Sequence, residues 1–177
     1  TLRGDSNERL TILSDAEKTA LYGIPSFDDF QRIEFFAMTE AERSLALQRR
    51  GILKQVYCML QIGYFKAKQA FFQFSLDDVP PEDVTFLMQR YFPGETLVVK
   101  PMSTKEYYAQ RQEISALFEY RLWTANDLPV LRDKAKLLVR TDVTATFLLA
   151  ELMVFLMAQR IVRPGYSTLQ TIIRDAL

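Results

Sequence analysis

The chain has 177 residues, and its 22 basic residues balance its 22 acidic residues. About half of the residues are hydrophobic (49%) and a quarter are charged (25%), which is typical of a globular protein with one large domain or two small ones. Histidine is absent, which excludes Ser-His-Asp and Cys-His nucleophilic sites and every metal site with a histidine ligand.

Helix signals follow one another along the chain. Capping-box patterns at residues 14–17, 39–42 and 103–106 predict three helix starts, and the sequence PPED at residues 80–83 predicts a fourth. Further helical patterns are found over residues 27–36 after Ser26, 52–68 after Gly51, 124–140 and 143–162, with a last helix capped by Ser167.

These elements predict an all-α fold, a multi-helix orthogonal bundle of about eight helices without a sheet. The single β-branched run, Leu97–Val99, is short and is followed closely by Pro101, so it predicts at most an isolated strand. We expect the loop at residues 93–102 to separate two helical subdomains, residues 10–95 and 103–177, that share a core.

Three features of the sequence indicate where the protein is found in the cell. Cys58 has no partner for an internal disulfide and lies in an apolar run, which indicates a core residue in a reducing compartment. Residues 1–9 are polar and do not form a signal peptide. The longest apolar run, Phe147–Ala158, contains Glu151 and is too short to cross a bilayer, so we expect it to be the most buried helix. A cytoplasmic protein without a membrane partner is predicted.

The balanced net charge hides a segregated pattern. Residues 43–76 contain six basic residues and no acid. Two interpretations are open. Acids from neighbouring helices could pair with these bases across the fold, or the bases could form a face for the phosphate groups of a nucleic acid. The six residues are Arg43, Arg49, Arg50, Lys54, Lys66 and Lys68.

The helical spacing within this stretch favours a contact surface. Steps of three and four residues place Lys54, Tyr57, Gln61, Tyr64 and Lys68 on one stripe of the helix, opposite an apolar face. Lysine, tyrosine and glutamine contact phosphates and base edges. We therefore expect this stripe to face solvent, together with Arg49 and Arg50.

The residues near this stripe are predicted to have structural roles. Lys66 lies nearer the apolar side and is expected to extend to the helix end or to pair with an acid. The phenylalanines at positions 65, 71, 72 and 74 are expected in the core. The acidic residues 77, 78, 82 and 83 fit helix N-termini better than a divalent-ion site, so no metal site is predicted.

Several motifs together resemble the N-terminal region of the large replicative transposases of the Tn-three type. The specific motifs are LQIGYFKA (residues 60–67) and RIVRPGYSTLQ (residues 160–170). Weaker motifs in the same order are LYGIP (21–25), QRIE (31–34), QRYFP (89–93) and EYRLW (119–123). The resemblance extends over nearly the whole chain.

The resemblance implies a helical domain that binds double-stranded DNA and recognises the terminal inverted repeats of the transposon. It places strand cleavage and joining, by an acidic triad with divalent metal of the DDE type, in another part of the parent transposase. The start without methionine and the end within a helical pattern agree with a fragment of a longer chain. We therefore expect a non-catalytic domain without a cofactor of its own.

The resemblance also assigns candidate DNA contacts. Basic residues of the family pattern match Arg49, Lys54 and Lys66, and a basic helix follows the position of Ser103. In this chain Glu106 and Glu113 dilute the charge of that helix. The full candidate set is Arg49, Arg50, Lys54, Tyr57, Gln61, Tyr64, Lys66, Lys68, Lys105 and Arg111.

A second function remains open. The domain could instead be a scaffold or dimerisation module that holds protomers together in the paired-end complex, with the rest of the transposase chain and a second copy as its partners. An exposed apolar patch would favour this alternative.

Overall fold

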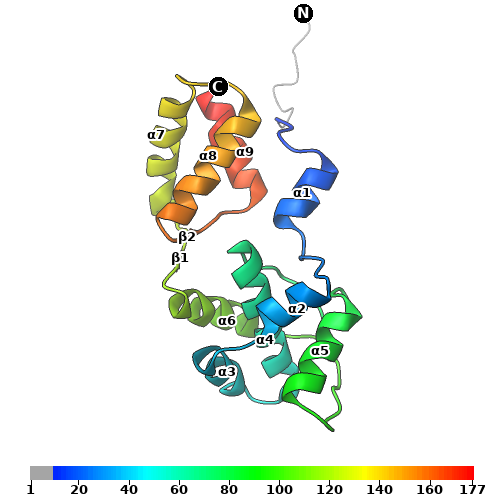
Figure 1. Cartoon of the computed structure of the whole chain (residues 1–177). Coiled ribbons are helices and arrows are strands. Elements are labelled where there is room, and N and C mark those ends of the chain that lie inside the picture. Colours follow the sequence, from blue (N-terminus) through cyan, green and yellow to red (C-terminus); the bar gives the residue numbers. More distant parts are fainter. Residues whose placement is uncertain (1–9) are drawn as a thin grey trace, which may run out of the picture. The chain divides into compact units, whose positions relative to one another are not determined.

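A computed structural model describes residues 10–177, which are predominantly helical (Figure 1). Nine α-helices and two strands of two residues each are found in this part of the chain, which confirms the all-α fold class. In chain order the elements are α1 (Asp15–Tyr22), α2 (Asp29–Phe36), α3 (Glu40–Leu47), α4 (Ile52–Lys68), α5 (Pro81–Tyr91), α6 (Thr104–Leu117), β1 (Arg121–Leu122), the 3-10 helix η1 (Ala125–Asp127), α7 (Leu128–Leu138), α8 (Ala145–Ala158), β2 (Ile161–Val162) and α9 (Tyr166–Ala176).

The helix starts follow from local capping chemistry. The Ser14 side chain accepts a hydrogen bond from the N–H of Glu17, and the Glu17 carboxylate accepts one from the N–H of Ser14, both at 3.2 Å. Thr39 and Ser103 cap α3 and α6 at the predicted positions by accepting from the N–H groups of Glu42 and Glu106, but the returning bond of a full capping box is not formed. The start of α2 differs from the prediction, because Asp28 and Gln31 form the capping box two residues after Ser26.

The chain divides into two compact units. Residues 23–122 form the central unit, and residues 10–22 with 123–177 form the terminal unit. This division differs from the predicted boundary at residues 93–102. Helix α6 packs on α3 and therefore belongs to the central unit, whereas side chains near α9 hold the segment that contains α1.

Helix α4 is the core of the central unit. It packs against α2, α3 and α5, as Figure 1 shows, and its ten consecutive residues Val56–Phe65 are all buried. Gly63 is required by this packing, because a Cβ atom at this position would overlap the ring of Phe36. The phenylalanines at 65, 72 and 74 are buried and Phe71 is half-buried, as expected for core residues.

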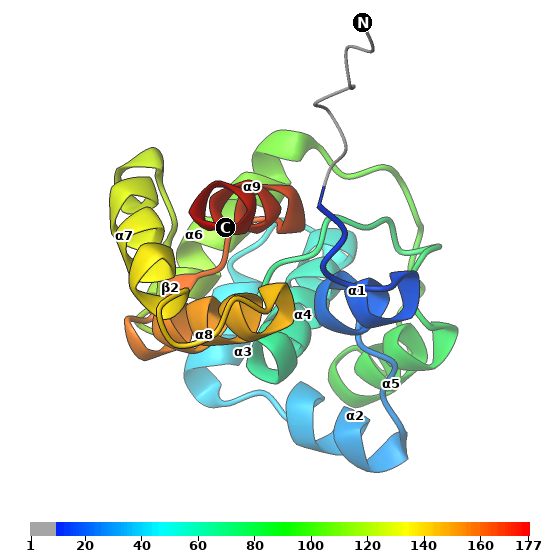
Figure 2. The same ribbon diagram turned by 90° about the horizontal axis from the view of Figure 1, so that it is seen from above.

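The terminal unit is built around α7, α8 and α9, which pack on one another (Figure 2). Helix α8 contributes Leu148, Leu149, Leu152 and Leu156 to the core. The prediction that Phe147–Ala158 would be the most buried segment is wrong. Val154 is 58% exposed on α8, whereas α4 is covered on all sides. None of the helices in residues 10–177 is long and apolar enough to cross a membrane.

Candidate nucleic-acid interface

The predicted polar stripe on α4 does not face solvent. Tyr57 is 2% exposed, and Gln61 and Tyr64 are fully buried, so the prediction is wrong for these three residues. Each of the three side chains forms a hydrogen bond inside the fold, although Gln61 Oε1 is buried without a partner among the described residues. The Tyr57 hydroxyl accepts a hydrogen bond from the N–H of Phe74 at 3.4 Å, and the Gln61 amide donates to the carbonyl of Phe72 at 2.5 Å. The three residues lie on one stripe of the helix as the spacing predicted, but tyrosine and glutamine can form hydrogen bonds within a core as well as on a surface.

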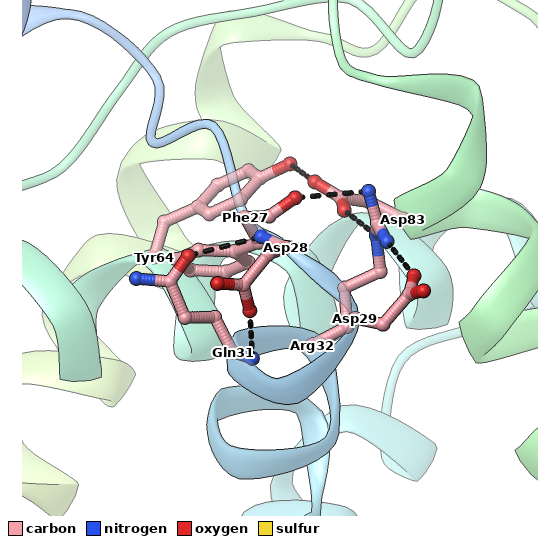
Figure 3. A network of polar contacts seen from close by, with 7 residues as sticks. All are labelled: Phe27, Asp28, Asp29, Gln31, Arg32, Tyr64 and Asp83. Atoms are coloured by element: carbon pink, nitrogen blue, oxygen red, sulfur yellow. Dashed lines mark hydrogen bonds and ion pairs between the residues drawn. The ribbon is translucent and has the colours of Figure 1, made fainter.

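Tyr64 belongs to a buried polar network, which Figure 3 shows from close by. Its hydroxyl donates to Asp83 Oδ2 at 2.6 Å, and Arg32 Nε donates to Asp83 Oδ1 at 2.9 Å. Arg32 also donates to Asp29 at 2.6 Å and to the carbonyl of Phe27 at 2.9 Å. The network therefore joins α2, α4 and α5 around the fully buried Asp83 side chain.

The pKa shifts in this network are typical of a structural site that is closed to solvent. Burial raises the pKa of Asp83 above its usual value, and the hydrogen bonds from Tyr64 and Arg32 oppose this shift. Burial, followed by the hydrogen bond to Asp83, raises the pKa of Tyr64. Asp83 is thus committed to Arg32 and Tyr64. No group of three or more metal-binding side chains is found within residues 10–177.

Two of the predicted DNA-binding cations are paired with acids from other helices. Lys66 Nζ lies 2.8 Å from Oε1 of Glu42, which is only 3% exposed. Arg49 pairs with Glu106 at 3.5 Å and also with Glu113. The pairing interpretation of the acid-free stretch is therefore confirmed for Lys66 and Arg49. The acids lie far away in the sequence, so no sequence window around the bases could reveal them.

The remaining cations of the predicted set differ in exposure. Arg50 is exposed, and Lys54 and Lys68 are half-buried. Neither Arg50 nor Lys54 forms an ion pair with any described residue. Lys105, in the first turn of α6, is exposed. Arg50, Lys54 and Lys105 are thus available to a partner.

Arg111 occupies an unusual position on α6. Its guanidinium lies over three aromatic rings, at 5.6 Å from Phe71, 5.5 Å from Tyr107 and 5.3 Å from Tyr108. It forms no hydrogen bond or ion pair within the described part of the chain, and its Nε is buried without a partner. The rings restrict the side chain while its N–H groups remain unused, an arrangement suited to an anionic ligand.

A row of cations along α7 was not included in the predicted set. Arg132 and Lys136 on α7 and Arg140 just after it are all exposed. The α-helical rise separates successive members by about 6 Å along the axis. None of them is hydrogen-bonded or ion-paired to another described residue. The spacing of four residues is the sequence signal that could have identified this row.

One tyrosine is flanked by two further arginines that were not included in the predicted set of DNA contacts. Arg43 and Arg90 lie 5.7 Å and 5.8 Å from the centre of the Tyr91 ring, and both are exposed. The Tyr91 hydroxyl is itself fixed, because it donates to the carbonyl of Phe36 at 2.7 Å. Helices α3 and α5 thus present a smaller pair of cations.

The RIVRPGYSTLQ motif has a structural role in the terminal unit. The Tyr166 hydroxyl accepts hydrogen bonds from the N–H groups of Ile12 and Leu13 at 3.2 Å and 3.1 Å. Gln170 donates to the carbonyl of Leu10 at 2.7 Å. Arg163 lies 4.8 Å from the centre of the Tyr22 ring and donates to the carbonyl of Leu21. The motif therefore fixes the segment that contains α1.

Comparison with known proteins gives one family. A search of curated proteins finds no match to the chain. A family model described as a domain of unknown function (DUF4158) matches residues 12–176. The chain therefore belongs to this family, and the match spans both the central and the terminal unit.

Proposed function

We propose that this domain binds double-stranded DNA as the N-terminal part of a Tn-three-type replicative transposase, and that it recognises the terminal inverted repeats of the transposon. The motifs LQIGYFKA and RIVRPGYSTLQ support the assignment to a transposase. The domain contributes binding, while a DDE-type catalytic site with divalent metal belongs to another region of the parent chain.

The α7 row carries the proposal. Arg132, Lys136 and Arg140 are exposed and have no partner in the described residues. A cation that is already paired must break that pair before it can displace a counterion from DNA, whereas an unpaired cation gains the whole interaction. The row is therefore better suited to phosphates than the paired Arg49 and Lys66.

A second contact region lies in the central unit. Arg111 and Lys105 lie on α6, Lys54 lies in the first turn of α4, and Arg50 precedes α4. Helices α4 and α6 are joined here, because the Gln110 amide donates to the carbonyl of Lys54 at 3.3 Å. Among these residues Arg111 is the candidate for recognising a defined anion, since its rings fix its position.

The experiment compares two exposed arginines of the terminal unit. Arg132 is unpaired, whereas Arg174 lies 3.1 Å from Asp175. Binding of a transposon-end duplex and of a scrambled duplex is measured by fluorescence anisotropy at several salt concentrations. Arg132→Ala should reduce the slope of log affinity against log salt by about one for both duplexes, and Arg174→Ala should leave it unchanged.

The native chain should bind the transposon end more tightly than the scrambled duplex. Equal affinity for the two duplexes would contradict the proposed recognition of the terminal inverted repeats. Equal salt slopes for native protein and Arg132→Ala would remove the α7 row as the contact surface.

The scaffold function is supported by a different observation. Phe30 is 84% exposed and Ile33 is 53% exposed, and they lie three residues apart on α2. Adjacent exposed apolar side chains are typical of a surface that meets another protein. Sedimentation velocity of the native chain and of Phe30→Gln tests this function. A concentration-dependent dimer that is lost in the variant would favour it, and a monomer in both would exclude self-association through α2.

A further inference from the structure

A pocket of about 280 Å³ opens in the central unit beside the first turn of α6. Its aromatic wall includes Tyr57, Phe74 and Tyr107, and the rings of Tyr57 and Phe74 stack with their centres 4.5 Å apart. Its polar lining includes Asp78, Ser103 and Thr104. The volume is near the lower end of the ~300–1,000 Å³ found for ligand pockets, which suits one small planar group.

Tyr107 identifies the pocket as a site with an unused donor. The residue is only 7% exposed and lines the pocket, yet its hydroxyl forms no hydrogen bond with any described residue. The hydroxyl oxygen is the part of Tyr107 that reaches the solvent in the pocket, where it can donate to a ligand. Burial raises the pKa of Tyr107, while Arg111 opposes the shift, so the hydroxyl is protonated at neutral pH and can donate to a ligand.

The pocket also has an unused acceptor. Oδ2 of Asp78 accepts hydrogen bonds from the N–H and the hydroxyl of Ser75, at 3.1 Å and 3.0 Å. Its other oxygen, Oδ1, accepts none from the described residues. Asp78 is exposed, so this oxygen is open to solvent and can accept a hydrogen bond from the amino group of a ligand.

One end of the pocket is suited to an anion. Ser103 caps α6 by accepting from the N–H of Glu106 at 3.2 Å, so that N–H group is already used. The N–H groups of Thr104 and Lys105 form no hydrogen bond with a described residue. These groups carry the positive end of the helix dipole, and the Lys105 ammonium is exposed in the same turn.

We propose that this pocket binds one unpaired nucleotide. The base lies against the aromatic wall, its exocyclic amino group donates to Asp78 Oδ1, and Tyr107 donates to a ring or carbonyl acceptor of the base. The phosphate lies at the first turn of α6. An aromatic side chain from a protein partner would use the wall but would make no bond with the anion end or with the exposed Asp78 carboxylate, so a nucleotide fits more of the lining. The choice of nucleic acid as the ligand rests on the proposed DNA-binding function.

Bases are commonly held in this way when they leave a duplex. Proteins that take up a single base stack it on aromatic side chains and form hydrogen bonds with its pairing edge. The amino group required by Asp78 predicts a preference. Cytosine has an exocyclic amino group and thymine has none, so the pocket should bind dCMP more tightly than dTMP.

The test is an NMR titration of the whole chain with dCMP, dTMP, 2-deoxyribose 5-phosphate and inorganic phosphate. Saturable shifts of the α6 amides are expected with dCMP, and weaker binding with dTMP and with the sugar phosphate. Tyr107→Phe should weaken dCMP binding about two- to tenfold, the effect of one hydrogen bond. The matched control is Tyr108→Phe, because Tyr108 is the adjacent tyrosine, is 50% exposed and does not line the pocket.

Each outcome decides a separate part of the proposal. Equal binding of dCMP and 2-deoxyribose 5-phosphate would overturn the base site, and absence of saturable shifts with dCMP would overturn the pocket altogether. Unchanged dCMP binding by Tyr107→Phe, or equal losses in both tyrosine variants, would overturn the role of Tyr107. Arg132→Ala, which removes a proposed duplex contact, should not change dCMP binding. A failure of the pocket is therefore distinguishable from a failure of duplex binding.

Discussion

Helices α4 and α7 both lie in basic stretches of the sequence, but the structure uses their charges differently. Lys66 of α4 is paired with Glu42, and Arg49, shortly before α4, is paired with Glu106 and Glu113. Arg132 and Lys136 of α7 are exposed and have no partner among the described residues. A basic stretch in a sequence therefore identifies cations but does not show whether they are available.

The difference follows from the depth of each helix. Residues Val56–Phe65 of α4 are fully surrounded, so a nearby charge loses much of its hydration and requires an opposite charge from another element. Only Leu131 and Ala135 of α7 are buried, and its remaining faces keep their contact with water. Solvent stabilises the charges of Arg132 and Lys136, whereas protein carboxylates stabilise those of Lys66 and Arg49.

The largest effect is expected from removing the acid at the centre of the α4 network. Asp83→Ala leaves the Arg32 guanidinium and the Tyr64 hydroxyl without their acceptor in a buried site. Loss of one partner of a buried pair costs about 3–5 kcal/mol of unfolding free energy. Urea denaturation followed by circular dichroism should show a strongly lowered midpoint.

The neighbouring acid provides the control for this experiment. Glu82 precedes Asp83 on α5 but is exposed, so Glu82→Ala should change the unfolding free energy by no more than about 0.5 kcal/mol. Similar losses in the two variants would show that the network is not what stabilises α4.

A smaller difference in unfolding free energy is expected between the substitution of a lysine in α4 and the substitution of a lysine in α7. Lys66→Ala leaves the carboxylate of Glu42 buried without its ion partner, which costs about 1–3 kcal/mol. Lys136→Ala removes an exposed, unpaired charge and should stay within about 0.5 kcal/mol. The two unfolding free energies are measured side by side in urea.

The same pair of variants should show the opposite order in DNA binding. Lys136→Ala should reduce the salt slope by about one, because Lys136 belongs to the row proposed to contact phosphates. A greater reduction by Lys66→Ala, in a variant that remains folded, would contradict the distinction between paired and unpaired cations.

The smallest effect concerns the chemical reactivity of the Cys58 thiol and involves no change in the stability of the fold. Burial raises the pKa of Cys58 on α4 to about 12. A raised pKa keeps the thiol protonated at every pH well below that value, so the reactive thiolate is absent at pH 8. A disulfide reagent should therefore fail to modify the native chain at pH 8 and should react fully in urea, whereas an amine reagent should modify the exposed Lys136 at once. Rapid modification of Cys58 without denaturant would show that α4 opens more readily than its burial indicates.

Local chemistry made much of the fold predictable. The caps at Ser14, Thr39 and Ser103 are found as predicted, and the bounds of α4, Ile52–Lys68, agree with the predicted range of 52–68. A cap depends on residues three positions apart, so the sequence contains all the information that it needs. The candidate site was less predictable, because the partners of Arg49 and Lys66 lie 57 and 24 residues away along the chain.

The prediction for α4 shows why the polarity of the side chains was not enough to predict which residues face solvent. Tyr57, Gln61 and Tyr64 were interpreted as a solvent-facing stripe because each can form hydrogen bonds. In the structure they do so with Phe74, Phe72 and Asp83 inside the core. The most apolar helix, α8, is in contrast partly exposed at Val154 and Met157, because it covers only one side of its core.

The sequence by itself determined the helical class, most helix starts and the positions of the cations, because these depend on residue type and on neighbours within a few positions. The tertiary structure alone decided that α4 is the buried core, that α1 belongs with α9, and that Arg132 and Lys136 are unpaired while Lys66 is not. These outcomes depend on contacts between elements distant in sequence. Such contacts determine which charges lose their water and therefore which of them must find a partner within the protein.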